Sequence, residues 1–376
     1  MKQKNNILIY LFFGIILVFL VLFILMPKRT FSLQENRVLQ EMPALNAREV
    51  TSGVFMEHTD RYIADHFPFR DTWITVKASC EYVAGKRNSN GIYYGKDGQL
   101  FPQFHSPDYS RLEQKIDWIN NWSASVPYPV SLCLIPSASD IQQDRLPTHT
   151  GSSEEEDAIQ FCYEKLSGPQ AIDLRPALIE HQNENIYYRT DHHWTSYGAK
   201  LAFDALQNHL YSAHNFDTST LIGTTVCDDF YGTSYSTSGY TWVNPDSIET
   251  YIDGNSASVE SFQTGVQNEP VRTGLYDGMK LNEKDKYSYF LGGISPLIHI
   301  HNSALSPSSL LLIRDSYSDS IAPFLSQSYS DIYLVDLRYY KDSIQQFIQE
   351  HPVNEILVMY SMKNFAEDNN LGLLIG

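Results

Sequence analysis

The sequence predicts an α/β protein whose core is a mostly parallel sheet covered by helices on both faces. Three runs in the last third, residues 309–313, 332–335 and 356–360, are almost entirely apolar, and apolar residues at helical spacing lie between them. Near-continuous apolar runs are typical of parallel strands buried on both faces, and amphipathic helices connect such strands. A further apolar run at 130–135 extends this pattern toward the middle of the chain.

Residues 7–26 form an apolar run without a charged side chain, which is long enough to cross a bilayer as a helix. Basic residues flank the run on both sides, and no small-residue cleavage motif follows it. We therefore predict an uncleaved single-pass anchor in the cell membrane, with a cytoplasmic N-terminus and an extracytoplasmic body, rather than a removed signal peptide. The expected order is a cytoplasmic tail at 1–6, the anchor at 7–26, a stalk and helical segment at 27–90, and the main domain at 91–376.

Local signals predict the elements between the anchor and the last third. Two amphipathic helices are expected on either side of Pro68, because proline cannot continue a helix. Residues 91–101 predict a hairpin with Asp97 and Gly98 at its turn. Residues 215–290 are rich in Ser, Thr, Gly and Tyr, and they predict an insertion of irregular or β structure in the main domain. The other expected elements are a helix around 112–119, strands at 130–135 and 171–174, a helix at about 196–210 capped by Thr195 or Ser196, and helices at 317–328 and 344–348.

Composition excludes some classes of function. The formal net charge is -17, whereas nucleic-acid binding needs a basic footprint, so no nucleic-acid partner is expected. The four cysteines are widely dispersed, and none has the spacing of a metal or redox site. Cys133 lies within the apolar run at 130–135 and is expected to be a small buried hydrophobe. We predict no metal and no cofactor.

The run TDHHWT at residues 190–195 places a carboxylate and an imidazole two residues apart, just before an expected helix. In an extended segment such residues point to the same side, so Asp191 and His193 are expected to meet. The residues between and after them, His192 and Trp194, would face the other way. An Asp bonded to one ring nitrogen of a His leaves the other nitrogen free to act as a base. Polar loops also hold such pairs for structural reasons, so the pair alone does not establish chemistry.

Ser316 is the candidate nucleophile because it follows the strand at 309–313 and opens a helix. In doubly wound sheets, functional groups collect beyond the carboxyl ends of the strands. Free backbone N–H groups at a helix N-terminus can stabilise an oxyanion, and His193 is the base that would take the serine proton. The alternative is that Ser316 only caps the helix, which is the commoner role of serine at such a junction.

The chain resembles the DHHW protein family, which is grouped with the SGNH-like acyltransferases and esterases. The resemblance implies an SGNH-like three-layer sandwich with a circularly permuted motif order, because the Asp/His block precedes the serine block. In the similar bacterial alginate O-acetyltransferases, an Asp-x-His-Trp motif also precedes an Asp-Ser block. The resemblance covers nearly the whole chain after the anchor, with blocks ENR at 35–37, FPFRD at 67–71, GKDG at 95–98, YRTDHHW at 188–194, FYGTS at 230–234, RDSY at 314–317 and VDLRYY at 335–340.

By this resemblance, Ser316 is the nucleophile, His193 is the general base and Asp191 is the residue that orients the base. Two residues depart from the family pattern. Arg314 replaces the Gly of the SGNH Gly-Asp-Ser block, where Gly would allow a close backbone approach, and Asp319 stands where related sequences commonly carry Asn. A carboxylate near the site would repel an anionic intermediate.

Four further residues are candidates for substrate or oxyanion support. Tyr317 adjoins the nucleophile, and Arg338 follows the strand at 332–335, from which it could reach the sheet edge beside the nucleophile. A salt bridge to a neighbouring carboxylate is the alternative role for Arg338. Trp194 could stack on a sugar ring, although packing into the core is the commoner role of such a residue. His192 is expected to be structural or a hydrogen-bond partner of the pair.

The resemblance implies an extracytoplasmic O-acyltransferase that passes an acyl group, acetyl in the leading hypothesis, through an ester on Ser316 to a hydroxyl of a cell-surface or secreted polysaccharide. Relatives of this type usually work with a multi-pass membrane O-acyltransferase, which is therefore an implied partner. A carbohydrate esterase with the same triad is one alternative, and a non-catalytic glycan-binding or assembly protein is another. A metal site like that of the DHH phosphoesterases has less support, because the sequence lacks their upstream carboxylate motifs.

Overall fold

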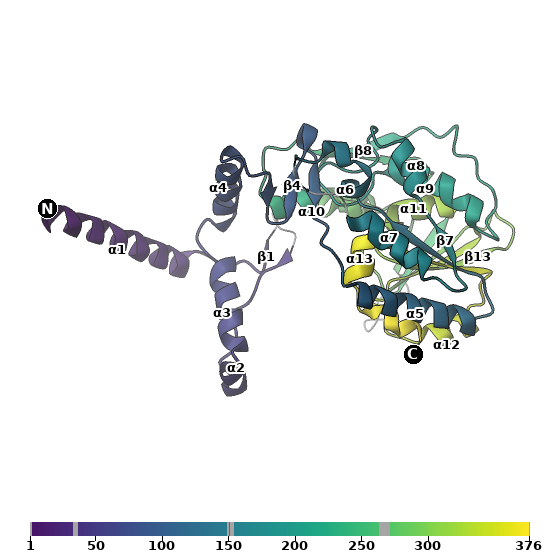
Figure 1. Cartoon of the computed structure of the whole chain (residues 1–376), viewed down its shortest axis with the longest axis horizontal. Coiled ribbons are helices and arrows are strands. Elements are labelled where there is room, and N and C mark those ends of the chain that lie inside the picture. The colour runs from purple at the N-terminus through teal and green to yellow at the C-terminus, as the bar shows by residue number, and fades with distance from the viewer. Residues whose placement is uncertain (1, 33–36, 149, 151–153, 263–270, 376) are drawn as a thin grey trace. The chain divides into compact units, whose positions relative to one another are not determined.

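The chain divides into two units in the computed structural model, which describes residues 2–32, 37–148, 150, 154–262 and 271–375 (Figure 1). The first unit comprises residues 1–89 with 236–242, and the second comprises residues 90–235 with 243–376. Residues 35–36 of the ENR block and residues 263–270 of the expected insertion lie outside the described residues.

The first unit begins with helix α1 (Lys2–Leu25). Within this helix, Ile7–Leu25 has a mean hydropathy of 3.3 and is long and apolar enough to cross a membrane. No other helix in the described part of the chain meets the same criteria. Length and composition agree equally with a membrane anchor and with a signal sequence, so the anchor and its orientation stay predictions.

A short ribbon and several helices follow α1 in the first unit. The break between the two longer helices contains Pro68, where the sequence predicted it. Gly53 has a positive φ of 83° and separates the helix at Ala47–Ser52 from the helix at Val54–Asp65, since a left-handed backbone ends one helix before the next begins. The elements are β1 (Phe31–Ser32) paired antiparallel with β2 (Arg37–Val38), α2 (Ala47–Ser52), α3 (Val54–Asp65), α4 (Arg70–Val83) and β3 (Asn88–Ser89).

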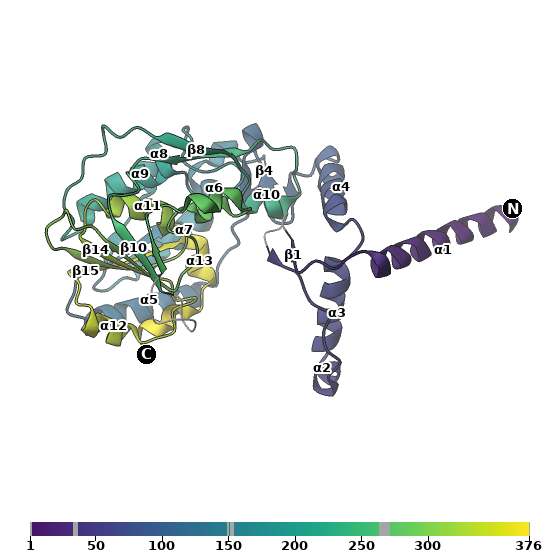
Figure 2. The ribbon, with the colours of Figure 1, turned by 180° about the vertical axis from the view of Figure 1, so that it is seen from behind.

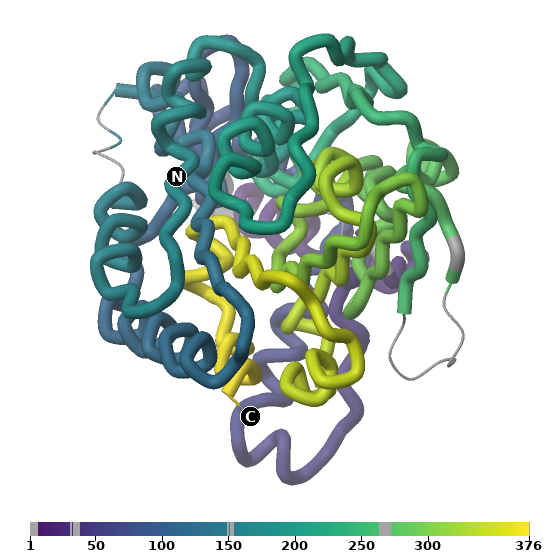
Figure 3. The backbone as a smooth tube through the Cα atoms, turned by 90° about the vertical axis from the view of Figure 1, so that its right-hand side faces the viewer, coloured from purple at the N-terminus to yellow at the C-terminus, as the bar shows by residue number. Residues whose placement is uncertain are grey.

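One large sheet forms the core of the second unit. Its described strands are β6 (Val130–Ile135), β7 (Gln170–Ile172), β10 (Ser258–Phe262), β11 (Val271–Thr273), β12 (Leu297–His301), β13 (Ser309–Arg314), β14 (Asp331–Val335) and β15 (Glu355–Ser361). Their order is β11-β10-β12-β14-β13-β15-β6-β7. Strands β14 to β7 in this order are parallel, whereas β12, β10 and β11 continue the sheet in antiparallel pairs. The predicted mostly parallel sheet is confirmed. Strands β6 and β15 pair although they are distant in sequence, and Figure 3 shows blue and yellow parts of the backbone near one another.

Helices cover both faces of this sheet (Figures 1 and 2). Along β13, Leu310 and Leu312 contribute to one buried cluster, and Leu311 and Ile313 contribute to the other. Burying each such side chain stabilises the fold by roughly 1.5–3 kcal/mol, so a strand of this composition requires a helical layer on each side. One layer contains α8 (Arg175–Glu180), α9 (Ser196–Leu206) and α11 (Ser318–Leu325), and the other contains α5 (Tyr109–Ser125), α7 (Glu154–Glu164), α12 (Ile344–Glu350) and α13 (Met362–Glu367).

The segment at 215–290 contributes to the core of the second unit, which its composition did not indicate. Strands β10 and β11 extend the large sheet, whereas β8 (Thr224–Phe230) and β9 (Asp246–Thr250) form a separate antiparallel pair with register shifts. The segment also contains α10 (Thr233–Ser238) and a 3-10 turn at Lys286–Tyr289.

Some predicted elements agree with the structure more closely than others. The hairpin consists of β4 (Ile92–Tyr94) and β5 (Leu100–Pro102), and its turn contains Asp97 and Gly98 with φ of 56° and 73°, as the Asp-Gly signal predicted. The helix after Ser316 spans only α11, which is shorter than the predicted 317–328. Strand β12 was not predicted, because its LIHIH sequence lacks the continuous apolar run that marks the other strands.

Candidate active site

The TDHHWT run lies in a bent loop, not in an extended strand as the spacing argument assumed. The loop is closed at its base, where Tyr188 N–H donates to His193 O at 3.1 Å and Tyr187 forms an antiparallel bridge with Trp194. Thr195, one of the two predicted caps, accepts a hydrogen bond from the first turn of α9. The closed loop and the capped helix therefore hold the residues between them in one conformation.

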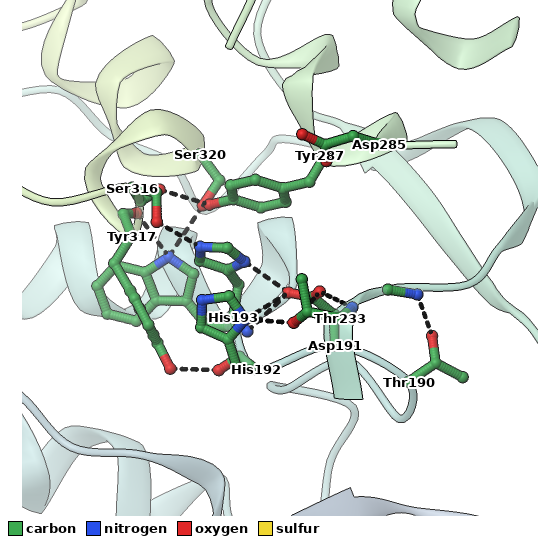
Figure 4. A network of polar contacts seen from close by, with 12 residues as sticks. Thr190, Asp191, His192, His193, Thr233, Asp285, Tyr287, Ser316, Tyr317 and Ser320 are labelled. Carbon is green, nitrogen blue, oxygen red and sulfur yellow. Dashed lines mark hydrogen bonds and ion pairs between the residues drawn. The ribbon is translucent and has the colours of Figure 1, made fainter. Parts of the chain in front are cut away.

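This loop brings Asp191, His193 and Ser316 into one hydrogen-bonded chain (Figure 4). Ser316 lies between the end of β13 and the start of α11, and its Oγ is 2.9 Å from His193 Nε2. On the opposite side of the ring, His193 Nδ1 is 2.5 Å from Asp191 Oδ1. The carboxylate and the imidazole are buried, whereas the serine is partly exposed. The arrangement leaves a hydroxyl accessible at the end of a buried acid–imidazole pair.

Hydrogen bonds keep Asp191 ionised and oriented. Its Oδ1 also accepts His193 N–H at 3.0 Å, and its Oδ2 accepts the N–H and the hydroxyl of Thr233 at 2.7 and 3.0 Å. Burial would raise the pKa of Asp191, but the imidazoles of His192 and His193 and these hydrogen bonds lower the pKa far below its usual value. An ionised Asp191 assigns the ring proton of His193 to Nδ1, which leaves the Nε2 lone pair directed at Ser316.

A second buried carboxylate supports the loop from β9. Asp246 accepts the N–H of Arg189 at 2.8 Å, and its other oxygen accepts the N–H and the hydroxyl of Thr190 at 2.7 and 2.6 Å. These hydrogen bonds therefore connect the backbone immediately before Asp191 to the segment at 215–290, which its composition had predicted only as an insertion.

Gly232 allows the backbone to pass directly over Asp191. A Cβ at position 232 would lie 2.2 Å from Asp191 Oδ2 and 2.3 Å from Asp191 Cβ, which are distances that real side chains do not adopt. Glycine at this position is required by that close approach.

Gly232→Ala is therefore expected to displace Asp191 and to slow modification of Ser316 by about 10²-fold, which is the typical cost of moving a catalytic group by about 1 Å. The rate of covalent labelling of Ser316 by a serine-reactive ester measures this effect. Gly278→Ala is the matched control, because a Cβ at Gly278 meets no atom within 4 Å. Equal labelling rates in the two variants would contradict the assigned role of Gly232.

Tyr287, from the 3-10 turn at Lys286–Tyr289, was not predicted as a site residue. Its ring stacks on the His193 imidazole with centroids 3.8 Å apart and an interplanar angle of 5°. Its hydroxyl donates to Ser316 O at 3.0 Å and is also hydrogen-bonded to the Ser320 hydroxyl at 3.1 Å (Figure 4). Burial raises the pKa of Tyr287 well above its usual value, so the hydroxyl stays a donor. Tyr287 fixes the plane of the imidazole and the backbone of the serine together.

The turn around Ser316 is held by the carboxylate of Asp315. One oxygen of Asp315 accepts Tyr317 N–H at 3.0 Å, and the other accepts the N–H and hydroxyl of Ser361 and the side-chain amide of Asn364. Among the described residues, none accepts a hydrogen bond from the N–H of Ser316 itself. This N–H is therefore a backbone donor beside the Ser316 hydroxyl that is available for an oxyanion.

Arg314 and Asp319, the two departures from the family pattern, form an ion pair with each other. Arg314 Nη1 is 2.7 Å from Asp319 Oδ1, and both side chains are buried. The expected repulsion between the Asp319 carboxylate and an anionic intermediate is offset by this paired guanidinium. Arg314 Nε and Nη2 have no hydrogen-bond partner among the described residues.

Asp319 is expected to make the stability of the fold depend on pH. Burial, opposed by Arg314, raises the pKa of Asp319 to about 7, whereas an unfolded Asp has a pKa of about 3.9. Between these values the folded state keeps a proton that the unfolded state loses. The free energy of unfolding therefore falls as pH rises through this window, by up to about 1.4 kcal/mol per pH unit.

Asp319→Asn should flatten this slope, because the amide oxygen can still accept from Arg314 while the titration is removed. Urea denaturation of the full chain in detergent, between about pH 4 and pH 7, measures the slope. Asp228→Asn, at an exposed position on β8, is the control and should leave the slope unchanged. Identical slopes in both variants would show that Asp319 does not titrate in this window.

Trp194 and Tyr317 do not have the accessible groups that substrate support requires. Trp194 is fully buried, and its indole N–H donates to Tyr317 O at 3.1 Å and to Ser320 Oγ at 2.9 Å. This burial leaves no ring face for a sugar, so stacking, the role considered for Trp194, is wrong. Tyr317 donates its hydroxyl to His192 O and its N–H to Asp315, so neither group is free for an oxyanion. Both residues position the loop on α11.

His192 and Arg338 lie at the periphery of the site. The extended-strand argument predicted that His192 faces away from the pair, and this is wrong. The centroid of its ring lies 3.8 Å from that of the His193 ring, and its Nδ1 is 2.7 Å from Thr233 Oγ1. Burial lowers the pKa of His192, so its ring is neutral. Arg338 binds both carboxylate oxygens of Asp336, at 2.9 and 2.6 Å, which is the salt bridge considered as the alternative to substrate contact.

The Asp191, His192 and His193 side chains each offer a ligand atom within 4.8 Å of the others, which is close enough for a cation. However, Asp191 and Ser316 already bond the two ring nitrogens of His193. A cation would displace one of these contacts, so the geometry favours the acid–base arrangement over the metal alternative.

Comparison with known proteins agrees with this architecture. The DHHW protein family model matches residues 128–335. A DHHW family protein from Eubacterium siraeum has 22% identity and a TM-score of 0.64, over 76% of this chain and 95% of that chain. Bacillus cereus PatB1, also solved with a sulfonyl adduct, has 21% identity and a TM-score of 0.60, over 74% of this chain and 97% of that chain. The O-acetyltransferase domain of Pseudomonas putida AlgJ has 15% identity and a TM-score of 0.47, over 75% of this chain and 94% of that chain.

No protein of curated function matches the sequence. At these identities, the likeness to the solved structures of the DHHW protein and of PatB1 shows a shared fold, a mixed α/β structure with a large and mostly parallel sheet. The family match covers more than half of the chain and includes the TDHHWT loop and Ser316. The chain belongs to the DHHW protein family.

Proposed function

We propose that the chain is a membrane-anchored O-acyltransferase whose catalytic unit lies outside the cytoplasm and works through an acyl ester on Ser316. The observation that carries this proposal is the chain of hydrogen bonds from Ser316 Oγ through His193 to Asp191, at 2.9 and 2.5 Å. A serine hydroxyl becomes a nucleophile only when a base takes its proton, and the free Nε2 of His193 has the position and the lone pair for this role.

In the first half of the reaction, Ser316 Oγ attacks the carbonyl carbon of an ester or thioester donor while His193 Nε2 takes its proton. The N–H of Ser316 donates to the oxyanion of the tetrahedral intermediate. The bond to the leaving group then breaks, and His193 returns the proton to that group. In the second half, an acceptor hydroxyl gives its proton to His193 and attacks the acyl ester. Ser316 leaves and regains the proton, so no net proton is consumed.

The acyl group in this proposal is acetyl and the acceptor is a hydroxyl of a cell-surface or secreted polysaccharide. The apolar helix at Ile7–Leu25 supports this location. The substrate class is the one that the resemblance to the alginate O-acetyltransferases implies. A multi-pass membrane O-acyltransferase is the proposed source of the acyl group. Water in place of the sugar hydroxyl would make the same site an esterase.

Covalent capture of Ser316 tests the proposal. Because PatB1 has been solved with a sulfonyl adduct, a sulfonyl fluoride is a suitable probe for the full chain in detergent, with the adduct located by mass spectrometry. We expect modification at Ser316 that disappears in His193→Ala. A folded wild-type protein that resists the probe would contradict the proposal and favour a non-catalytic glycan-binding role.

A second measurement separates transfer from hydrolysis. The protein is supplied with an aryl acetate, with and without an oligosaccharide acceptor, and the acetylated sugar and free acetate are quantified. We expect the amount of acetylated sugar to rise and the amount of free acetate to fall when the acceptor is added. Release of acetate alone at every acceptor concentration would assign the site to an esterase.

A further inference from the structure

A cluster of two imidazoles and one carboxylate lies in the large sheet, outside the site described above. His299 and His301 are two residues apart on β12, so their side chains point to the same face of the sheet. In the antiparallel pairing with β14, His301 is directly opposite Asp331, and His299 is opposite Tyr333. The register therefore places His301 beside Asp331, and His299 two residues along the same face of the sheet.

The three side chains converge on a single point. His299 Nε2 and His301 Nδ1 are each 2.9 Å from Asp331 Oδ1, and the three ligand atoms all lie within 4.8 Å of one another. Around a tetrahedral Zn²⁺ with bonds of about 2.0–2.1 Å, neighbouring ligand atoms are about 3.3 Å apart. The two nitrogen–oxygen distances of 2.9 Å are within a few tenths of an ångström of this value.

Neighbouring groups orient two of the three ligands. The other carboxylate oxygen of Asp331 accepts the Ser330 hydroxyl at 2.8 Å, so Oδ1 is the oxygen presented to the imidazoles. The His299 ring stacks on Tyr333 with centroids 4.5 Å apart and an interplanar angle of 11°, which fixes its plane. The hydrogen bond to Asp331 is of the kind that orients metal-ligating carboxylates. All three ligands are partly exposed, so an ion can reach them from solvent.

We propose that His299, His301 and Asp331 bind a divalent transition-metal cation, Zn²⁺ or one of the same ligand preference. Two imidazole nitrogens and one carboxylate oxygen are ligands that suit Zn²⁺, whereas Ca²⁺ and Mg²⁺ prefer sites made entirely of oxygen ligands. Water completes the coordination at the open side. The ion joins β12 to β14, which is the position where the parallel part of the sheet changes to its antiparallel part. It therefore has a structural role that does not depend on chemistry at Ser316.

Zinc binding to the full chain in detergent tests this proposal. The protein is stripped with a chelator, and Zn²⁺ alone is then titrated in by calorimetry. We expect one equivalent to bind at this cluster, with affinity weakened at least tenfold in His301→Ala and in Asp331→Asn. His301 is about half exposed, so its replacement removes a ligand without opening the core. His105 is exposed and distant in sequence from the cluster, so His105→Ala is the matched control and should bind Zn²⁺ as the wild type does.

Two further measurements make the result decisive. Thermal unfolding with and without Zn²⁺ should show a rise in melting temperature in wild type and in His105→Ala that both ligand variants lack, because only a ligand of the folded state stabilises it. His192→Ala tests whether zinc binds instead at the cluster of Asp191, His192 and His193. Equal zinc binding in wild type and both ligand variants, or a loss confined to His192→Ala, would overturn the proposal.

Discussion

We expect Ser316→Ala to abolish covalent labelling and to lower the rate of acyl transfer by about 10⁴-fold or more, which is the scale of nucleophile removal in serine hydrolases. The reason is that Ser316 Oγ is the partly exposed end of the hydrogen-bonded chain through His193 and Asp191. Alanine removes the oxygen atom of the proposed acyl ester and leaves His193 with no hydroxyl proton to take. The measurements are mass spectrometry of the sulfonyl adduct and the rate of acetate transfer from an aryl acetate.

Ser318→Ala is the matched control for this substitution. Ser318 is the first residue of α11 and is buried, and its Oγ has no hydrogen-bond partner among the described residues. Loss of this hydroxyl removes no hydrogen bond among the described residues, so labelling at Ser316 should persist. Transfer that survives in Ser316→Ala at the wild-type rate would move the chemistry to another residue and refute the serine ester.

Asp191→Asn is expected to have the second largest effect, a loss of about 10⁴-fold in rate with the fold retained. Thr233 donates two hydrogen bonds to Asp191 Oδ2, from its N–H and its hydroxyl. An asparagine at 191 will therefore turn its carbonyl oxygen toward Thr233 and its amide toward His193 Nδ1. The ring proton then moves to Nε2, where it faces Ser316, and the base is lost.

The comparison of Asp191→Asn with Asp228→Asn checks this explanation. Asp228 is exposed on β8, so its amide variant should retain the wild-type rate. Nuclear magnetic resonance of labelled histidine should place the His193 proton on Nδ1 in wild type and on Nε2 in Asp191→Asn. An unchanged tautomer together with full activity would exclude Asp191 as the orienting residue.

Much of the fold was predictable because its parallel strands carry a strong local signal. Strands β6, β13 and β15 are buried on both faces almost throughout, and β14 is buried except at Asp331 and Tyr333. A continuous apolar run can therefore be recognised as a strand without knowing which residues face which side. Strand β12 lacks this signal, because only Ile298 and Ile300 are fully buried while its histidines face a partly exposed side. Alternating runs of this kind are compatible with several local structures, and the pairing with β14 decides among them.

The candidate site was predictable to a smaller extent. Asp191, His193 and Ser316 were identified from residue type, spacing and position after a strand. The residues that hold them, Tyr287 and Asp246, belong to the segment marked as an insertion, and their roles depend on contacts between distant parts of the chain. Gly232 had a partial signal, because it lies in the FYGTS block that carried the family resemblance.

The amino-acid sequence was sufficient to identify the apolar N-terminal run, the mostly parallel α/β core and the family, because each is encoded in residue type and local order. In the sequence alone, Arg314 and Asp319, which depart from the family pattern, suggested a site that stabilises an anionic intermediate less well. Their pairing at 2.7 Å is a property of the folded chain, as is the stacking of Tyr287 on His193. Both depend on which side chains the sheet and its connections bring together. Contacts between residues far apart in sequence have no local signature, so they could be recognised only after folding.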